Sequence, residues 1–374
     1  MTPLRLLVLP GDGIGPEITE ATLAVLQSAA ASAQLPLEFE RDRIGFEALH
    51  AEGTTVPDRV LERARVVDGT LLGPISHLDY PPREQGGINV SAAFRTRLDL
   101  YENLRPARTR PGLGHTREPM DLVIVRECTE GFYPDRNMAV GIGEFMPTLD
   151  MALSVRKITA FACERIARRA FEHARRRRRL VTAVHKANNF ILSDGLFLRE
   201  VRKVAAEYPD VVLEEIIIDA MAARLVREPQ RFDVVLATNF YADILSDLAS
   251  ELSGSLGLAG SINANESMCA AQAQHGSAPD IAGQDRANPT SLILSAAMWL
   301  EWLAERRDDP RIGIVAKAIH DAVDQVLLDP ALRTADLGGP LGTKAFGEVV
   351  AARVASIAQG ASSANSSPGR SIRT

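Results

Sequence analysis

The chain has 374 residues, of which 46% are hydrophobic and 24% are charged, and its 42 basic and 48 acidic side chains give a net charge of −6. This length suits two globular domains, and the mildly acidic charge is not typical of a nucleic-acid-binding protein. No apolar run approaches the ~20 residues that a membrane span needs, and the first residues resemble a β-strand more than a signal peptide. Because three scattered cysteines favour reduced thiols, we expect a cytoplasmic protein without disulfide bonds.

Short apolar runs alternate with amphipathic segments along the chain. Runs typical of buried β-strands occupy residues 4–10, 69–74, 121–126, 180–185, 212–218 and 233–237. Helical periodicity occurs at residues 16–31, 194–207 and 241–253. This alternation predicts an α/β fold. Residues 132–150 are expected to form a long functional loop or a β-hairpin arm, and residues 360–374 a disordered tail.

Two conspicuous patterns have ordinary structural explanations. The five arginines at residues 175–179 could bind anions, but we favour a solvated helix end that complements the helix dipole. Gly11, Gly13 and Gly15 follow the first predicted strand, and Pro16 suits the first turn of a helix. Their spacing differs from the G-x-G-x-x-G pattern of Rossmann nucleotide-binding turns. A tight strand-to-helix turn is therefore predicted, and such a turn can still lie close to a bound cofactor.

Three aspartates follow predicted strands. Asp243 and Asp247 are four residues apart, so a helix places both carboxylates on one face. Such a pair suits a hard divalent cation, although aspartates at a helix start can also simply cap the helix and offset its dipole. Asp219 ends the strand at 212–218, and ligands of open α/β sheets bind at the carboxyl ends of strands. Three carboxylates at two strand ends favour a site for Mg²⁺ or Mn²⁺.

A set of basic residues and one tyrosine could complete a site for an acid. Arg95 and Arg105 lie ten residues apart, and Arg126 ends a predicted strand. Guanidinium groups bind carboxylates through paired hydrogen bonds, and three of them beside a metal site indicate a polycarboxylate substrate. Lys186 ends another predicted strand, and Tyr133 follows Arg126 by seven residues. These two could transfer protons, although spacing alone favours a surface lysine and a half-buried tyrosine.

The ordered set of motifs resembles the β-decarboxylating dehydrogenase family, which includes isocitrate, 3-isopropylmalate, homoisocitrate and tartrate dehydrogenases. The resemblance is carried by residues 11–17, 98–106, 126–133, 185–188, 219–222, 243–247, 275–283 and 287–289. It implies an isocitrate/isopropylmalate dehydrogenase-like α/β fold, with two α/β domains around a mixed sheet and not a Rossmann fold. Residues 1–102 and 258–359 would form the cofactor-binding domain. Residues 103–257 would form the substrate, metal and dimerisation domain, with an arm around residues 132–150.

The resemblance also implies a role for each candidate residue. The substrate carboxylates would be bound by Arg95, Arg105 and Arg126. The Mg²⁺ or Mn²⁺ ion would be held by Asp219, Asp243 and Asp247. Lys186 would remove the proton of the 2-hydroxyl group, and Tyr133 would protonate the enol that is left when CO₂ departs. Active sites of this family are shared across a homodimer, so Lys186 and Asp219 would come from the partner chain.

The cofactor loop resembles the family's His-Gly-Ser-Ala-Pro-Asp version. The expected cofactor contacts are His275, Gly276, Ser277, Ala278, Asp280 and Asn288. Asp280 stands where an acid accepts hydrogen bonds from both adenosine ribose hydroxyls. Its charge would repel a 2′-phosphate, so NAD is expected instead of NADP. His275 would stack near the adenine, which Asn288 would also contact.

Asn89 and Ser91 fall at positions that help to select the substrate in this family, where isopropylmalate enzymes carry leucines. A small polar pocket is therefore expected, which leaves isocitrate, plain or substituted D-malate and tartrate open. The expected activity is NAD- and Mg²⁺- or Mn²⁺-dependent oxidative decarboxylation of such a malate-type 2-hydroxy acid. One alternative is a catalytically silent regulatory subunit, although such subunits lose catalytic residues that this chain keeps. Another is a metal-free Rossmann 2-hydroxy-acid dehydrogenase.

Overall fold

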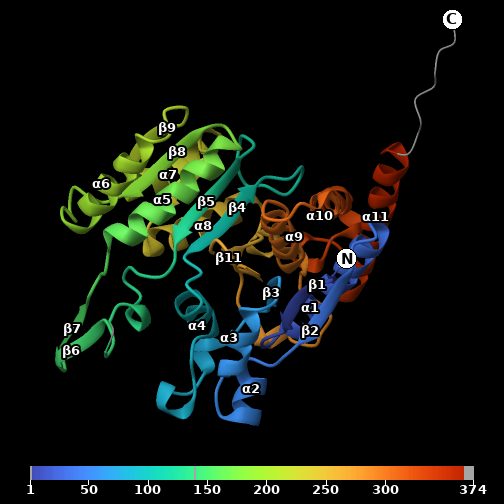
Figure 1. Cartoon of the computed structure of the whole chain (residues 1–374), viewed down its shortest axis with the longest axis horizontal. Coiled ribbons are helices and arrows are strands. Elements are labelled where there is room, and N and C mark those ends of the chain that lie inside the picture. Colours follow the sequence, from blue (N-terminus) through green and yellow to red (C-terminus); the bar gives the residue numbers. More distant parts are fainter. Residues whose placement is uncertain (1, 139, 366–374) are drawn as a thin grey trace, which may run out of the picture.

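The computed structural model describes residues 2–138 and 140–365, and within them ten strands form one large sheet (Figure 1). These strands are β1 (Leu4–Leu9), β2 (Leu37–Arg41), β3 (Gly69–Leu72), β4 (Glu102–Arg108), β5 (Asp121–Glu127), β8 (Leu180–His185), β9 (Val212–Ile217), β10 (Val234–Ala237), β11 (Ile262–Ala264) and β12 (Cys269–Gln272). The α-helices are α1 (Gly15–Ser32), α2 (Gly45–Glu52), α3 (Asp58–Ala64), α4 (Val90–Arg97), α5 (Ala160–Arg175), α6 (Ser193–Ala205), α7 (Ile218–Arg227), α8 (Asn239–Ser253), α9 (Thr290–Ala304), α10 (Pro310–Leu328) and α11 (Thr343–Asn365).

The sheet is mixed, and its strand order is β2-β1-β3-β12-β11-β4-β5-β10-β8-β9. The short strand β11 runs antiparallel to both of its neighbours, and β4 runs antiparallel to β5. The first five strands in this order come from the two end portions of the chain, and the last five come from its middle. Figure 1 shows the blue and orange segments together in one half of the molecule and the green segments in the other. The antiparallel pair β11–β4 joins the two halves of the sheet.

Local sequence explains the element boundaries well. Helix α5 buries one face through Cys163, Ile166 and Ala170, at helical spacing, and Thr159 caps its start by accepting a hydrogen bond from the amide of Ala162. The six predicted strands and three predicted helices are all confirmed, each with ends within two residues of the prediction. Among the described residues, none of the helices has the length and apolar character that a membrane span requires.

Strand β9 is less buried than its sequence suggested. It lies at the edge of the sheet beside β8, and of its six residues only Ile216 is buried. Two glutamates explain this position, since Glu214 contacts Arg231 and Glu215 contacts Arg202 at the protein surface. Charged side chains of this kind are common on edge strands. The prediction of a strand covered on both faces was therefore wrong for this segment.

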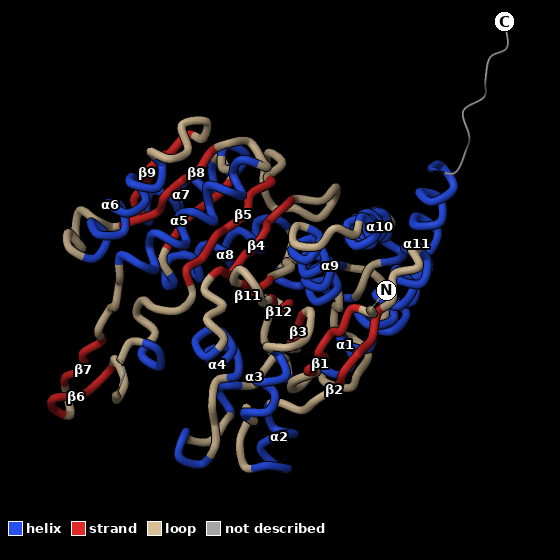
Figure 2. Tube along the Cα trace, in the orientation of Figure 1, coloured by secondary structure: helices blue, strands red, loops and turns tan. Residues whose placement is uncertain are grey.

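The segment expected to form a loop or an arm contains a hairpin made by β6 (Glu144–Thr148) and β7 (Met151–Ser154). Figure 2 shows these two strands at the end of loop segments, away from the large sheet. At the other end of the chain, α11 continues to Asn365. Residues 360–365 are therefore helical, which corrects the expected start of a disordered tail, while residues 366–374 lie outside the described residues.

The arginine run at the end of α5 is paired with other groups and is not merely solvated. Arg176 contacts Glu305, and Arg177 lies 2.7 Å from the wholly buried Asp233. The three cysteines are free and buried, as expected of reduced thiols. Burial raises the pKa of the Cys128 thiol to about 11, so this group is an inert thiol at neutral pH.

Candidate active site

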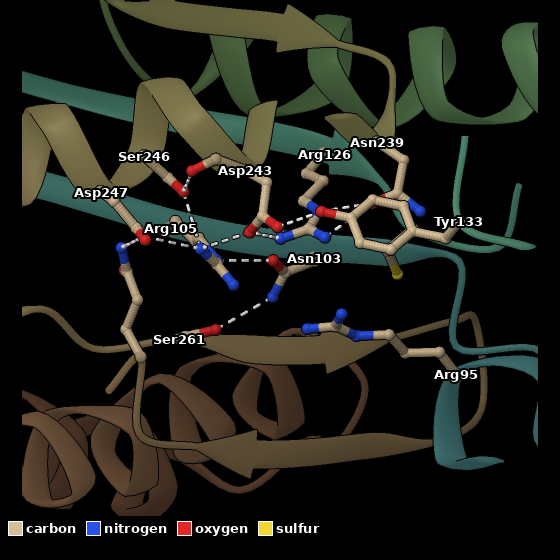
Figure 3. A network of polar contacts seen from close by, with 12 residues as sticks. Arg95, Asn103, Arg105, Arg126, Tyr133, Asn239, Asp243, Ser246, Asp247 and Ser261 are labelled. Carbon is tan, nitrogen blue, oxygen red and sulfur yellow. Dashed lines mark hydrogen bonds and ion pairs between the residues drawn. The ribbon is translucent and has the colours of Figure 1, made fainter. Parts of the chain in front are cut away.

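The candidate site begins at the neighbouring antiparallel strands β4 and β5. Asn103 pairs directly with Arg126, and Arg105 lies two residues beyond Asn103, so the three side chains share one face of the sheet. Helix α8 packs against both strands and supplies Asp243 and Asp247, one helical turn apart. Figure 3 shows the five side chains converging between the sheet and this helix.

Arg105 is buried and links both acids of α8. Its Nη1 lies 3.3 Å from Oδ1 of Asp243 and 3.2 Å from Oδ1 of Asp247, and it donates to the hydroxyl of Ser246 at 2.7 Å. Its Nε donates to the side-chain oxygen of Asn103 at 2.7 Å. Burial lowers the pKa of Arg105 to about 10, and repulsion from Arg126 contributes to this shift. The guanidinium is thus held between two carboxylates and two neutral groups.

Asp243 also contacts Arg126 and Tyr133, so both of its oxygens are engaged. Arg126 donates to Oδ1, and the hydroxyl of Tyr133 donates to Oδ2. Burial alone would raise the pKa of Asp243, but Arg126 and Arg105 outweigh it and hold the pKa below its usual value. Burial raises the pKa of Tyr133, which Asp243 raises further against the opposing effect of Arg126. At neutral pH the site therefore contains an ionised carboxylate beside a protonated phenol.

The third arginine, Arg95, enters from α4 on the other side of the same space (Figure 3). Its Nε donates to Asn263 at 2.8 Å, while its two terminal nitrogens have no partner among the described residues. Burial lowers the pKa of Arg95 to about 9, and Arg126 and Arg105 lower it further. We call the group made of Arg95, Arg105, Arg126, Asp243 and Asp247 the arginine–aspartate cluster. Its three cations exceed its two anions, so an anionic ligand would offset the remaining positive charge.

Lys186 and Asp219 form a separate pair at the carboxyl ends of β8 and β9. The ammonium group of Lys186 donates to the carboxylate of Asp219. Just before it, Nδ1 of His185 accepts a hydrogen bond from the amide of Ala187 at 3.1 Å, which suits an orienting residue better than a ligand. Within the described part of the chain, no contact joins this pair to the arginine–aspartate cluster.

Two of the three predicted metal ligands lie together. Asp243 and Asp247 project from one face of α8, and Oδ2 of Asp247 has no partner among the described residues. Hard divalent cations prefer such carboxylate oxygens. No group of three possible metal-binding side chains gathers in the described part of this single chain, because Asp219 lies with Lys186 instead. The carboxylates of Asp243 and Asp247 suit a divalent cation. This chain therefore brings together two of the three acids that were expected to bind the metal.

The glycine turn and the predicted cofactor loop lie against each other, although they are far apart in sequence. The amide of Ile14 donates to the carbonyl of Ser277 at 2.8 Å. A Cβ atom on Gly13 would lie 2.1 Å from that same carbonyl oxygen, so only glycine fits there. The φ angles of Gly11 and Gly13 are +76° and +57°. The predicted tight turn is thus confirmed, and it buttresses the loop that starts at His275.

Within that loop, Gly276 and Asp280 are exposed, and Ala278 adopts a left-handed conformation with φ +39°. Nδ1 of His275 lies 2.9 Å from the carbonyl of Gly276. Burial lowers the pKa of His275, so the ring is neutral near pH 7. The neutral imidazole of His275 is suited to stacking on a base, and the exposed carboxylate of Asp280 is suited to accepting hydrogen bonds from ribose hydroxyls.

Three residues that were predicted to contact substrate or cofactor form side-chain hydrogen bonds with other groups of this chain. Asn89 caps the start of α4. The hydroxyl of Ser91 accepts a hydrogen bond from Gln272 at 2.7 Å, and Asn288 donates to Asp336 at 3.0 Å. Asn89 precedes helix α4 and Ser91 lies in its first turn, so both residues belong to the segment that carries Arg95.

Residues 5–350 match the family model described as isocitrate/isopropylmalate dehydrogenase. The chain belongs to this family. The isocitrate/homoisocitrate dehydrogenase of Thermus thermophilus is 42% identical over 92% of this chain and 97% of its own length. The 3-isopropylmalate/3-methylmalate dehydrogenase of Methanocaldococcus jannaschii is 39% identical over 94% of this chain and 98% of its own.

A solved structure of isocitrate dehydrogenase from Methylococcus capsulatus superposes on the chain with a TM-score of 0.83. The two sequences are 37% identical, and the superposition covers 94% of this chain and 99% of that protein. The family and the isocitrate/isopropylmalate dehydrogenase-like fold implied by the motifs are therefore confirmed.

Sequence reasoning missed the neutral side chains that position the charged ones of this family member. The missed residues are Asn103, Asn239, Ser246, Asn263 and Gln274. Asn103 could have been found from the two-residue period of a strand that contains Arg105, and Ser246 from its place between Asp243 and Asp247.

Proposed function

We propose that this enzyme oxidises a malate-type 2-hydroxy acid with NAD⁺ and releases one carboxylate as CO₂, with Mg²⁺ or Mn²⁺ bound at Asp243 and Asp247. The observation that carries the proposal is the excess of positive charge in the arginine–aspartate cluster, next to the protonated phenol of Tyr133. Family membership supports the reaction class, and the names of the relatives include isocitrate, homoisocitrate, 3-isopropylmalate and 3-methylmalate dehydrogenases.

In this proposal the arginines hold the substrate carboxylates, and the unpaired terminal nitrogens of Arg95 supply one of these contacts. Lys186, as the neutral amine, would take the proton of the 2-hydroxyl group, and a bound NAD⁺ would supply the acceptor for the hydride from C2. A divalent cation held by Asp243 and Asp247 would supply Lewis-acid catalysis to the substrate. The bond between C3 and its carboxylate then breaks, and Tyr133 donates a proton to C3.

The preference for NAD rests on Asp280. Its side chain is exposed on the cofactor loop, and its carboxylate has no partner among the described residues. It can therefore accept hydrogen bonds from two ribose hydroxyls, whereas a 2′-phosphate would be repelled. His275, Gly276, Ser277 and Ala278 would form the rest of the loop surface, with Asn288 near the adenine.

A second copy of the chain would complete the site, because Lys186 and Asp219 lie apart from the arginine–aspartate cluster. Large apolar side chains surround both parts at the surface. They are Phe145, Met146, Leu149, Phe190, Ile191, Leu192, Phe240 and Ile244, each between 41% and 99% exposed. Apolar surface of this extent marks a protein interface. We therefore propose a homodimer in which the β6–β7 hairpin also contacts the partner.

The division of the chain follows from the same proposal. Residues 1–102 and 258–359 would bind the nucleotide, and residues 103–257 would bind substrate and metal and form the dimer. The sheet order is compatible with this division, because its two halves come from these two sets of residues. The buried free cysteines fit a reducing compartment, so a cytoplasmic location stays our prediction.

The test is NADH formation by the purified chain with Mn²⁺ and a panel of D-malate, D-tartrate, isocitrate, homoisocitrate and 3-isopropylmalate, scored also for CO₂. We expect equal amounts of NADH and CO₂ from at least one acid with a small polar substituent, and loss of both in excess EDTA. Full NADH production in EDTA without CO₂ would refute the metal-dependent reaction. No NADH from any acid, together with tight binding to a catalytic homologue, would identify a regulatory subunit instead.

The shared site has its own test. Lys186→Ala and Asp243→Asn variants are each expected to be inactive, since they remove groups from the two separate parts of the site. Mixing the two chains after unfolding and refolding should restore about a quarter of the wild-type rate, because half of the dimers then hold one intact site of two. A mixture that stays inactive, although mixed dimers have formed, would place all of these residues within one chain's site.

A further inference from the structure

Gln274 joins the predicted cofactor loop to the predicted metal site. It lies between β12 and His275, and its side-chain Nε2 donates to Oδ1 of Asp247 and to the hydroxyl of Ser250, both at 3.0 Å. Asp247 and Ser250 belong to α8, which packs on the other half of the sheet from β12. One amide group thus connects the two halves of the sheet at the candidate active site.

The contacts of Gln274 fix how the carboxylate of Asp247 is presented. Oδ1 of Asp247 accepts from Gln274 and also lies 3.2 Å from Nη1 of Arg105, while Oδ2 has no partner among the described residues. Both donors lie on Oδ1, and the side chain of Asp247 is 53% exposed, so Oδ2 is open to a ligand. That oxygen is the one available to a cation.

The orientation of the amide follows from its neighbours. If its oxygen and nitrogen were exchanged, Oε1 would face the negative carboxylate of Asp247, which cannot donate a hydrogen bond. In the observed orientation Oε1 of Gln274 is buried without a partner. The backbone amide of Gln274 also donates to the hydroxyl of Ser291 at 3.2 Å, so both ends of the residue are held. A buried acceptor without a partner is costly, which indicates that the contact with Asp247 serves more than stability.

We propose that Gln274 couples metal binding to nucleotide binding, so that each ligand increases the affinity of the enzyme for the other. This inference rests on the proposed function. A cation bound by Asp247 would hold that carboxylate in one orientation and so keep its hydrogen bond with Gln274 in place. His275 and Gly276 follow immediately, so ordering of Gln274 orders the start of the cofactor loop. Coupling between two binding sites is reciprocal, so the same factor must appear in both affinities.

The experiment uses the full chain without substrate. The dissociation constant of Mn²⁺ is measured by electron paramagnetic resonance with and without saturating NADH, and that of NADH by its fluorescence with and without saturating Mn²⁺. In the wild type we expect about ten-fold tightening of each ligand by the other. In Gln274→Met, which keeps the length of the side chain and removes its donor, the factor should fall below about two-fold, while Mn²⁺ and NADH still bind separately.

Gln325→Met is the matched control, because Gln325 is an exposed residue of α10 whose side chain contacts only Arg353 among the described residues. It should keep the ten-fold coupling. Coupling that persists in Gln274→Met, or independent binding of the two ligands in the wild type, would overturn the inference and leave the proposed function standing. If the wild type binds neither Mn²⁺ nor NADH, the proposed function itself fails.

A measurement on the wild type keeps the test decisive even if Gln274→Met folds poorly. Mn²⁺ alone should slow amide hydrogen exchange in residues 275–283, and Mg²⁺ should have the same effect. Exchange in this segment that is unchanged by saturating Mn²⁺ would contradict the coupling.

Discussion

Strand β4 carries a charge cluster on each of its two faces, and the clusters differ in how completely their groups are paired. On one face Arg105 belongs to the arginine–aspartate cluster. On the other face Glu102, which has no exposed surface, accepts a hydrogen bond from Arg169 at 2.8 Å and lies 2.6 Å from Nε2 of His173. Burial would raise the pKa of Glu102, but His173 and Arg169 outweigh it and lower the pKa to about 2.

The difference shows that burial of charge alone does not identify a ligand site. The guanidinium group of Arg169 is matched by two acids, because it contacts Glu172 as well as Glu102. In the arginine–aspartate cluster, the terminal nitrogens of Arg95 and one oxygen of Asp247 remain without partners in the described structure. A charge cluster in which every group has a partner stabilises the fold. A cluster with unpaired donors and acceptors beside like charges is instead a candidate site for a ligand.

The largest effect is expected from Arg95→Ala. Because Arg95 would bind a substrate carboxylate, kcat/KM should fall about 10³-fold, or about 4 kcal/mol, mainly through KM. The free energy of unfolding should not decrease, since the change removes a cation that burial, Arg126 and Arg105 disfavour. Steady-state kinetics and urea unfolding measure the two quantities. Arg97→Ala, on the exposed side of the same helix, is the control and should change neither. A stability loss with unchanged kcat/KM would make Arg95 structural.

Glu102→Gln should show the opposite behaviour. Removing one partner of a buried ion pair leaves Arg169 without the carboxylate of Glu102, so the free energy of unfolding should fall by about 3 kcal/mol. The value of kcat/KM per folded molecule should stay within about three-fold of the wild type, because Glu102 faces away from the candidate site. Glu172→Gln, at a half-exposed partner of Arg169, is the control, with a change below about 0.5 kcal/mol. If Glu102→Gln folded stably but lost its activity, the proposed division of strand β4 into a ligand-binding face and a stabilising face would be wrong.

Acid pH should remove the contribution of Glu102 without mutation. Its folded-state pKa of about 2 lies below the ordinary value of 4.5, so the unfolded state binds more protons between these values. The stabilisation is therefore complete above about pH 4.5 and is lost as the pH falls toward 2. Urea unfolding of the wild type and of Glu102→Gln at pH ~5 and ~3.5 should show their difference in stability shrinking at the lower pH. A constant difference would mean that folding does not lower the pKa of Glu102.

Much of the candidate site could be predicted because its charged residues obey local rules. The four-residue spacing of Asp243 and Asp247 places both on one face of α8, as observed. Arg126 ends a strand that periodicity located correctly. The alternation of side chains along a strand and the period of a helix depend only on neighbouring residues in the sequence. They can therefore be predicted without knowledge of the tertiary structure.

Long-range arrangement was harder to predict. Nothing local shows that β11 inserts between β12 and β4, or that Gln274 reaches across to Asp247. Burial of β9 was misjudged because a strand at the edge of a sheet and a central strand can have similar apolar content. Neutral partners such as Asn239 gave no signal, because their value lies in geometry between distant strands and helices.

The smallest change in the free energy of unfolding is expected from an ion pair that is exposed to solvent. Arg176 at the end of α5 contacts Glu305 at the end of α9, and both side chains are substantially exposed. Arg176→Ala should therefore change the free energy of unfolding by less than about 0.5 kcal/mol. Its neighbour Arg177 instead contacts Asp233, which is wholly buried, so Arg177→Ala should cost several times more. Urea unfolding of the two variants compares adjacent arginines that differ mainly in the burial of their partners. Equal losses would show that partner burial does not set the value of a charge pair here, and the contrast between the two faces of β4 would then need another cause.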